Sequence, residues 1–264
     1  MPALRDEGIC LRHWDWSETS QTVSVFGRSL GVLRGLAKGA RRERGRFGGG
    51  IDLLSRGEFG VIVKPTTELA TFTDWDLLET FPGLRDSLPA NRISFYAADL
   101  VARMVAPADP HPGLYDEFAS LLRAVGGRSS PDRAQEVSAQ TEQAARTAQA
   151  LLRFQWRLLQ ETGVQPALDA EGRAATLWFD PRSGGFTEIE PEHGWRVRRE
   201  TLELLRRVNS GADGVSSAPL ETLDRANRLL AAHLRETLQM EPPTLTHLFG
   251  NLLGRSTRSG PRPI

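Results

Sequence analysis

The feature that most constrains the fold is a change of hydrophobic period at Phe81-Pro82-Gly83. Before this tripeptide, in residues 8–78, apolar residues recur at every second position, as in 59–63, which is typical of β-strands. From Ala90 onward they recur at helical spacing. Proline and glycine end regular structure, so the tripeptide indicates a boundary between a β region and a mainly helical region.

Turn signals divide the β region into short segments with no helical pattern between them. The predicted strands are Ile9–His13, Thr22–Phe26, Leu30–Ala37, Ile51–Ser55, Phe59–Lys64 and Leu69–Leu77. Five or six strands in about seventy residues favour a small closed barrel of the OB type.

The helical region is interrupted once. Two helices are predicted with buried faces formed by Ile93, Ala97, Leu100 and Met104, and by Tyr115, Phe118, Leu121, Leu122 and Val125. The polar stretch 128–147 is expected to be a loop leading into an exposed helical turn, and a longer helix follows with Ala148, Leu151, Leu152, Gln155 and Leu159 on its buried side. Further helices are predicted at Thr201–Val208, Leu220–Leu238 and Thr244–Leu253. The fold class is α+β: an OB-fold barrel at 1–82, a helical domain at 83–253 with a small irregular insert at 164–198, and a flexible tail at 254–264.

Composition excludes several classes of protein. With 39% hydrophobic and 25% charged residues, the 264-residue chain has enough apolar material for a core. No run of 18 apolar residues occurs and the N-terminus lacks a signal-peptide pattern, so we expect a soluble, cytoplasmic protein. A single cysteine, Cys10, supplies neither an internal disulfide nor a multi-cysteine zinc site.

Net charge is zero, with 33 basic and 33 acidic residues, but the distribution is uneven. Residues 28–46 contain one acid, Glu43, and seven cations, which gives a local charge of +6. The cations are Arg28, Arg34, Lys38, Arg41, Arg42, Arg44 and Arg46. Because such a field acts over about 8–10 Å at physiological salt, a local cluster can bind a polyanion on a neutral protein.

Catalytic patterns are missing. The histidines (His13, His111, His193, His233 and His247) show no helical metal-ligand spacing, and no GxSxG motif occurs. Asp74 and Asp76 alternate in one predicted strand, where two solvated carboxylates are favoured over a metal site. Gly48-Gly49-Gly50 lacks the Lys-Ser/Thr of a nucleotide-binding loop. We therefore expect a protein that is not an enzyme and needs no cofactor.

The strongest chemical signal is the segment 38–50, a glycine-rich loop predicted to be flexible. Arginine forks pair with two phosphate oxygens, glycines let backbone N–H groups approach phosphates, and Phe47 is predicted to stack on an unpaired base. We therefore predict a DNA-binding site made of Phe47 and the seven cations of residues 28–46.

These residues resemble the RecO family of bacterial recombination mediators. The similarity includes Gly8–Arg12, Trp16-Ser17-Glu18-Thr19-Ser20 and, most specifically, Ala37-Lys38-Gly39-Ala40-Arg41-Arg42. It continues through Leu78–Arg85 and, more weakly, through 154–166, 179–185 and 229–249. Coverage is almost the whole chain, although only the N-terminal third is specific.

The resemblance implies an OB-fold, a helical domain, and a non-hydrolytic role in recombinational repair, in which the protein binds single- and double-stranded DNA, anneals complementary strands and helps load the recombinase. It also implies RecR and the acidic C-terminal tail of single-stranded-DNA-binding protein as partners, and a cytoplasmic, nucleoid-associated location. Many relatives carry a four-cysteine zinc module where this chain has Val164–Trp195, without cysteine. We therefore expect no zinc in this degenerate insert and a hairpin packed around Trp178, Phe179 and Phe186; a weak oxygen site of Asp169, Glu171, Glu188, Glu190 and His193 is disfavoured.

Two further questions stay open at this point. The rim of an apolar groove for the acidic tail is formed either by Arg123 and Arg128 or by Arg196, Arg198 and Arg199. Two rival functions also remain: an enzyme with a metal at Asp74 and Asp76, and a non-catalytic helical adaptor whose barrel mediates dimerisation. The adaptor predicts no binding to short single strands.

Overall fold

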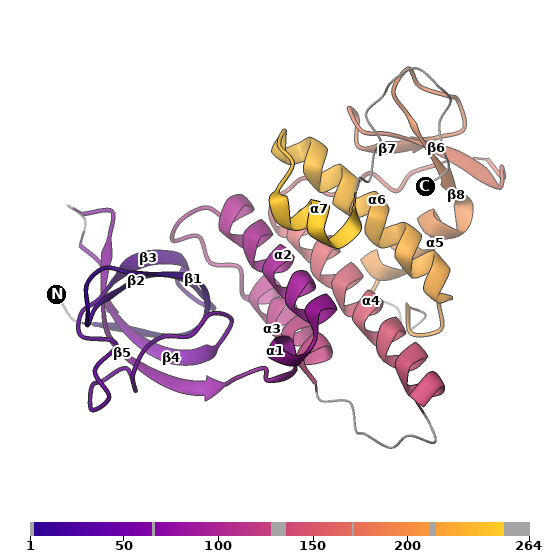
Figure 1. Ribbon diagram of the computed structural model, residues 1–264. Helices are drawn as coiled ribbons and strands as arrows, with labels where there is room; N and C mark the ends of the chain where they lie inside the picture. Colours follow the sequence, from indigo (N-terminus) through magenta and orange to yellow (C-terminus); the bar gives the residue numbers. More distant parts are fainter. Residues whose placement is uncertain (1–2, 65–66, 128–135, 171, 212–214, 251–264) are drawn as a thin grey trace. The chain divides into compact units, whose positions relative to one another are not determined.

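The structure is a computed structural model that describes residues 3–64, 67–127, 136–170, 172–211 and 215–250. Two compact units make up the chain, Met1–Arg128 and Ser129–Ile264. The first contains a barrel and three helices, and the second contains helices and a small sheet (Figure 1). Helices α1–α3 lie in the same unit as the barrel, and the domain boundary between residues 82 and 83 stays a prediction.

Five strands close into the barrel of the first unit. They are β1 (Leu4–Asp15), β2 (Gln21–Gly27), β3 (Gly31–Ala37), β4 (Arg56–Ile62) and β5 (Ala70–Glu79). Neighbours pair in the order β1-β2-β3-β5-β4, and β1 also pairs with β4 to close the ring. All pairs are antiparallel except β3 with β5. This five-stranded barrel confirms the predicted OB-fold.

The predicted strand at 51–55 is wrong. Leu54 has a φ of 60°, and its N–H bonds back to the carbonyl of Cys10, 2.8 Å away, so the segment turns beside the bulge in β1 instead of extending. Ile51 and Leu54 are nevertheless buried. Their apolar character, which suggested a strand, is explained by this burial beneath a turn.

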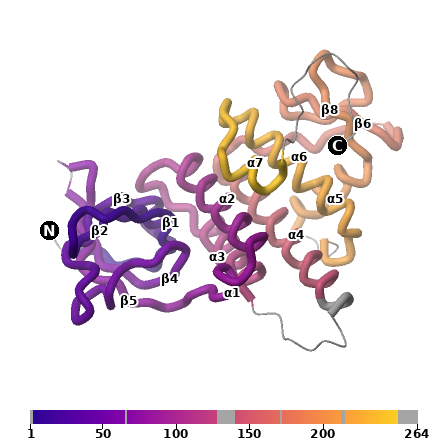
Figure 2. Tube along the Cα trace, in the orientation of Figure 1, coloured from indigo at the N-terminus to yellow at the C-terminus, as the bar shows by residue number. Residues whose placement is uncertain are grey.

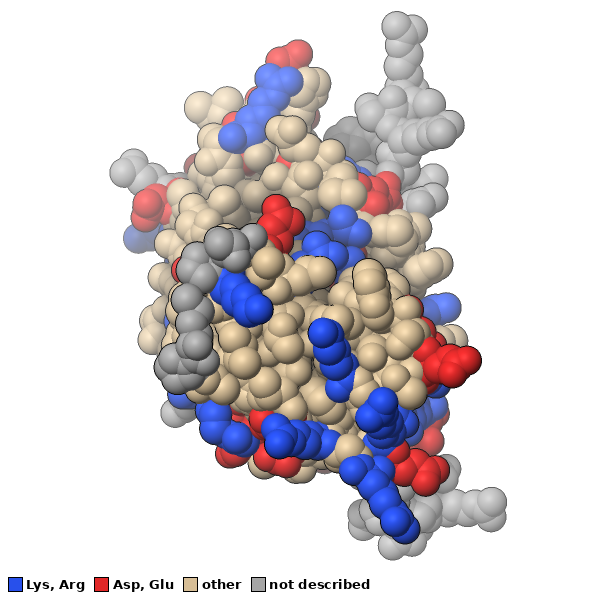
Figure 3. Space-filling model, turned by 90° about the vertical axis from the view of Figure 1, so that its left-hand side faces the viewer, with Lys and Arg blue, Asp and Glu red and all other residues tan. Residues whose placement is uncertain are grey.

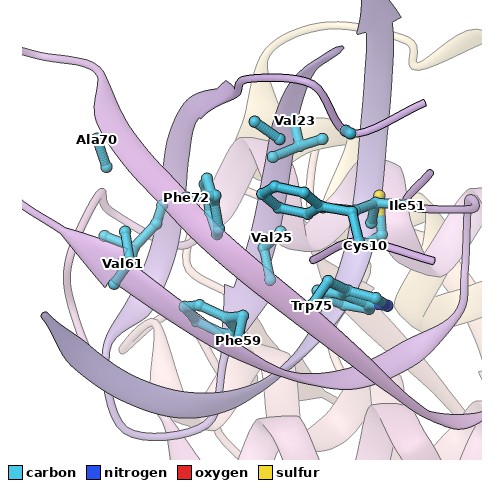
Figure 4. Close-up of a cluster of buried hydrophobic side chains, with 13 residues drawn as sticks. Cys10, Val23, Val25, Ile51, Phe59, Val61, Ala70, Phe72 and Trp75 are labelled. Carbon is cyan, nitrogen blue, oxygen red and sulfur yellow. The ribbon is translucent and has the colours of Figure 1, made fainter. Parts of the chain in front are cut away.

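The barrel encloses a cluster of buried side chains, which Figure 4 shows as sticks. Val23 and Val25 point inward from β2, and the rings of Phe59 and Trp75 stack with centroids 6.3 Å apart. The period-two pattern of the sequence therefore reports the inner face of the barrel. Burial also raises the pKa of the Cys10 thiol to about 12, so this thiol stays protonated and is a poor nucleophile.

Three helices complete the first unit: α1 (Gly83–Asp86), α2 (Leu88–Met104) and α3 (Pro112–Gly126). The Ser87 side chain caps α2 by accepting a hydrogen bond from the N–H of Ala90. Asp99 of α2 accepts a hydrogen bond from Arg12 of β1, which ties the helix to the barrel. Asp109 lies in the segment between α2 and α3, which crosses the turn between β2 and β3. Gly31 in that turn has a φ of +69°, and a Cβ there would clash with the backbone of Asp109, so glycine is needed at this crossing.

Glu79, at the end of β5, joins the barrel to α3. Its carboxylate accepts hydrogen bonds from Arg123 at 2.7 Å and from Arg56 at 3.0 Å. The hydrogen bonds from Arg123, with a further contribution from Arg56, hold the pKa of Glu79 below its usual value. The Glu79 side chain is 25% exposed, so solvent screens these pairs only partly.

We expect Glu79→Gln to lower the free energy of unfolding by about 1–2 kcal/mol at pH 7. Because the folded-state pKa is depressed, the stabilisation is present above the unfolded pKa of about 4.3 and is lost as pH falls through the folded value. Denaturant unfolding at a series of pH values measures this difference. The matched control is Glu58→Gln, on the exposed side of β4, which should change little at any pH. If Glu79→Gln is less stable than the wild type by the same free energy of unfolding at pH 2 as at pH 7, the stabilisation does not depend on the charge of Glu79.

The second unit is built on α4 (Glu136–Glu161), α5 (Arg199–Asn209), α6 (Leu220–Leu238) and α7 (Pro243–Phe249) (Figures 1 and 2). Leu151, Leu152 and Leu159 of α4 are buried as predicted, and a buried hydrogen bond of 2.7 Å joins Gln155 to Asn227 of α6. Helix α4 begins at Glu136, so the helical turn expected at the end of the polar stretch 128–147 is longer than one turn and is continuous with the following helix. No described helix has both the length and the hydropathy needed to cross a lipid bilayer.

The insert forms a three-stranded sheet in the order β7-β6-β8, from β6 (Thr176–Asp180), β7 (Gly185–Thr187) and β8 (Trp195–Arg198). Its packing centre is the buried ring of Phe179, which contacts Phe186 at 5.1 Å and Trp195 at 5.5 Å between centroids. Trp178 was expected to share this cluster, but adjacent strand residues point to opposite faces, so it lies on the other side. Among the described residues no three His, Cys, Asp or Glu side chains are placed to hold a metal ion, and Glu171 lies outside those residues.

Candidate nucleic-acid interface

The predicted cations follow the outside of β3 and the loop after it. Arg34 lies on β3, and Lys38, Arg41, Arg42, Arg44 and Arg46 lie in residues 38–55, here called the β3–β4 loop. All six of these side chains are exposed. On the face of the barrel in Figure 3, Lys and Arg side chains gather along the lower edge with a few acidic side chains among them.

Two of the seven cations already have acidic partners. Arg28 donates two hydrogen bonds to Asp116 of α3, at 3.0 and 2.9 Å, and these bonds raise its pKa. Arg41 lies 2.9 Å from a carboxylate oxygen of Asp15. Within the described part of the chain the other five form no ion pair. They are Arg34, Lys38, Arg42, Arg44 and Arg46, and with the exposed acid Glu43 among them they leave this surface with an excess of positive charge.

Phe47 does not belong to this exposed surface. Its side chain is 4% exposed and lies in the barrel core with Ile51 and Trp75. A ring buried inside the protein is not available to stack on a base, so the predicted stacking role of Phe47 is wrong. The neighbouring glycines suggested a flexible loop, whereas the buried Phe47 ring attaches this part of the β3–β4 loop to the barrel core.

The β3–β4 loop is tied to the barrel rather than free. The Trp75 N–H of β5 donates to the carbonyl of Arg46 at 2.9 Å, and the Ile51 N–H donates to the buried Gln21 side chain at 3.0 Å. Tight turns before and between these points keep the backbone compact, with hydrogen bonds from the Gly45 N–H to the carbonyl of Arg42 at 3.0 Å and from the Gly50 N–H to the carbonyl of Phe47 at 3.2 Å. This corrects the expectation of a flexible loop and means that the cations are presented on a formed scaffold.

A pocket of about 330 Å³ opens beside these cations. It lies between the β3–β4 loop, the end of β3 and residues 16–20, the β1–β2 loop. Trp16 lines it and is 68% exposed. Trp16 is not among the site residues predicted from the sequence. The available signal was a tryptophan inside a polar turn, where no strand pattern requires a buried ring.

The alternative metal site at Asp74 and Asp76 contains a cation of the protein itself. The Arg5 guanidinium lies 3.4 Å from a carboxylate oxygen of Asp74 and 3.2 Å from one of Asp76. A metal ion placed between these carboxylates would meet a positive charge. The pair therefore has a structural partner in the barrel.

The candidate rim residues for an acidic tail are also partly engaged. Arg123 is bound to Glu79, and Arg199 lies 3.0 Å from Glu188 with only 17% of its side chain exposed. Arg198 is 3.8 Å from Glu221. Arg196 is exposed and forms no ion pair with the described residues, and Arg128 lies outside them.

Comparison with known proteins connects these features to one family. The family model described as "Recombination protein O N terminal" matches residues 1–81, and "Recombination protein O C terminal" matches residues 85–246. The first match covers the barrel strands and the β3–β4 loop, and the second runs from the second half of α1 to the middle of α7.

Several curated proteins named "DNA repair protein RecO" are similar to this chain. That of Geobacter sulfurreducens is 28% identical over 253 residues, covering 90% of this chain and 96% of the relative. That of Syntrophobacter fumaroxidans is 31% identical over 210 residues, 77% of each protein. That of Rhodopirellula baltica is 38% identical over 119 residues, 45% of this chain and 44% of the relative, so this match spans about half the relative's length. With two family models matching most of the sequence and the expected barrel in place, this chain belongs to the RecO family.

Proposed function

We propose that this protein acts in recombinational DNA repair by binding single- and double-stranded DNA without sequence preference, annealing complementary strands and helping to load the recombinase. The relatives' name, DNA repair protein RecO, supports the pathway. The DNA-binding part of this proposal rests on one observation: the cations on β3 and the β3–β4 loop are exposed, and five of them form no ion pair with the described residues. We place this activity in the bacterial cytoplasm, at the nucleoid.

The physical basis is neutralisation of phosphates. Each phosphate contact releases condensed counterions, which favours binding and makes affinity fall steeply with salt. Because phosphate contacts carry no base information, the preference for sequence is minimal. Neutralising two complementary strands on one surface lowers their mutual repulsion and lets their bases meet. The tied loop supports this proposal, since a surface formed beforehand loses little conformational freedom on binding.

We also propose that the protein is not an enzyme and needs no cofactor. Two observations support this. The single thiol, Cys10, is fully buried and protonated, and the carboxylates of Asp74 and Asp76 have Arg5 as their partner.

The proposed protein partners are RecR and the acidic tail of single-stranded-DNA-binding protein, and both follow from family membership. For the tail, Arg196 is the rim candidate whose charge is exposed and without an ion pair to the described residues. Such a guanidinium is available to a carboxylate of an incoming peptide.

We expect the protein to accelerate annealing of short complementary oligonucleotides at about 50 mM salt and to lose most of this effect at about 200 mM. A fluorescence-quenching assay measures the rate. The protein should also anneal strands coated with single-stranded-DNA-binding protein, and removal of the acidic tail of that protein should abolish this second activity alone. Failure to anneal, together with no binding to short single strands, would support the adaptor function instead.

A further inference from the structure

The pocket beside the cations combines three kinds of wall. Its aromatic and aliphatic walls come from Trp16 and Leu36, and its cationic edge comes from Lys38 and Arg42. Hydroxyl groups and a glycine complete it, from Ser17, Thr19, Ser20 and Gly39. Its volume of about 330 Å³ lies within the usual range of ligand sites.

The position of Trp16 is unusual for its side chain. Tryptophan is the largest apolar side chain and is normally mostly buried, yet 68% of Trp16 is exposed at the mouth of this pocket. An exposed indole presents a flat aromatic face to solvent. Flat faces of this kind stack on nucleobases, and stacking tolerates any base because every base has a π-face.

Hydrogen bonds hold both loops of the pocket in place. Within the β1–β2 loop, the Trp16 N–H donates to the carbonyl of Ser20 at 2.9 Å. Between the loops, the Gly39 N–H donates to the Ser20 hydroxyl at 3.2 Å and the Arg41 N–H to the carbonyl of Thr19 at 3.1 Å. Gly39 has a φ of +69°, which suits glycine at the point where the chain leaves β3 for this turn. The backbone segments that carry the indole and the cations are therefore held on one framework.

We propose that this pocket is a base-binding subsite, in which one unpaired nucleobase of single-stranded DNA stacks on Trp16 while Lys38 and Arg42 bind the adjoining phosphates. The proposal rests on the DNA-binding function proposed above and deepens it. In a duplex the bases are already stacked and paired, so only the phosphate contacts remain available. The subsite therefore gives the protein a preference for single strands that the cations alone do not supply.

The chain offers a matched control for Trp16. Trp14 is 45% exposed and lies two residues earlier, at the end of β1, but it does not line the pocket. Replacing either residue removes the same side chain from the surface of the same barrel. A difference between the two variants therefore reports the pocket and not the loss of a tryptophan.

The test measures fluorescence anisotropy of three labelled probes with the full-length chain: oligo(dT), an abasic strand of equal length and a duplex. We expect Trp16→Ala to weaken oligo(dT) binding roughly 5- to 150-fold and to change duplex and abasic-strand binding by less than about twofold. Trp16→Phe should recover most of the lost affinity, and Trp14→Ala should bind all three probes like the wild type. Lys38→Ala should weaken all three.

Equal oligo(dT) binding by Trp16→Ala and the wild type would overturn the proposal. So would an equal loss on all three probes, because that result places the effect of Trp16 on the backbone or on folding rather than on a base. If the wild type binds none of the probes at low salt, the DNA-binding function itself fails. That outcome is distinct from failure of the subsite, in which the wild type binds DNA and Trp16 has no base-dependent effect.

Discussion

Simultaneous replacement of Lys38, Arg42, Arg44 and Arg46 by Ala is expected to weaken binding to single-stranded DNA by about 10³- to 10⁴-fold at 50 mM salt. These four side chains are exposed cations of the β3–β4 loop that form no ion pair with the described residues. Each single-strand phosphate contact contributes about 0.7 to the slope of log affinity against log salt, so four lost contacts should flatten that slope by about 2.8. Titration of a labelled oligonucleotide at several salt concentrations measures both quantities.

The control is a variant with the same change of net charge elsewhere. Arg92, Arg153, Arg173 and Arg182 are exposed and form no ion pair within the described chain. Replacing them by Ala lowers the net charge by the same four units, and we expect a much smaller loss of affinity, because screening over about 8–10 Å confines the effect of a charge to its surroundings. If both quadruple variants lose affinity equally, or the loop variant keeps the wild-type salt slope, the loop is not the binding surface.

Replacement of Phe47 by Ala is expected to lower the free energy of unfolding of the first unit by about 3–5 kcal/mol. The Phe47 ring is almost fully buried in the barrel core, and removing it leaves a cavity that the surrounding strands fill only partly. The loss should also weaken DNA binding indirectly, because Phe47 is the core anchor next to Arg46. Denaturant unfolding followed by tryptophan fluorescence and circular dichroism measures the stability.

The conservative variant Phe47→Leu separates anchoring from stacking. Leucine keeps most of the buried apolar volume, so we expect a much smaller cost than for alanine and nearly wild-type DNA binding. A Phe47→Leu variant that is stable but binds single strands as weakly as Phe47→Ala would instead support the base-stacking role that the sequence suggested and the structure contradicts.

Local patterns predicted the parts of the fold that depend on them. The alternation of Phe59 and Val61 marks residues of β4 that face inward, although Val63, just past the strand, is exposed. The helical spacing of Ile93, Ala97 and Leu100 marks the buried side of α2. Each pattern reports one face of one element buried against a core, and such burial leaves a direct imprint on the order of residues. The helical turn predicted before residue 148 is in fact the first part of α4, whose length the sequence did not indicate because these first turns are polar and carry no apolar stripe.

The tertiary structure decided which loop residues face solvent. Phe47 and Trp16 are both aromatic residues in glycine- or serine-rich segments, yet the first is buried and the second exposed. No periodicity exists in a turn, so only the path of the chain across the barrel determines the direction of such a side chain. The tertiary structure also decided the conformation of Ile51–Ser55. The left-handed backbone conformation of Leu54 makes this apparent strand a turn.

The sequence alone therefore determined the order of β and helical regions, the closed barrel and the position of the basic segment, because period and composition are local properties. Long-range pairing decided which cations form ion pairs. Arg28 pairs with Asp116 of α3, 88 positions away in the chain, while Arg42 pairs with no acid among the described residues. The pocket is likewise a tertiary feature, since it exists only where two loops distant in sequence are joined by hydrogen bonds.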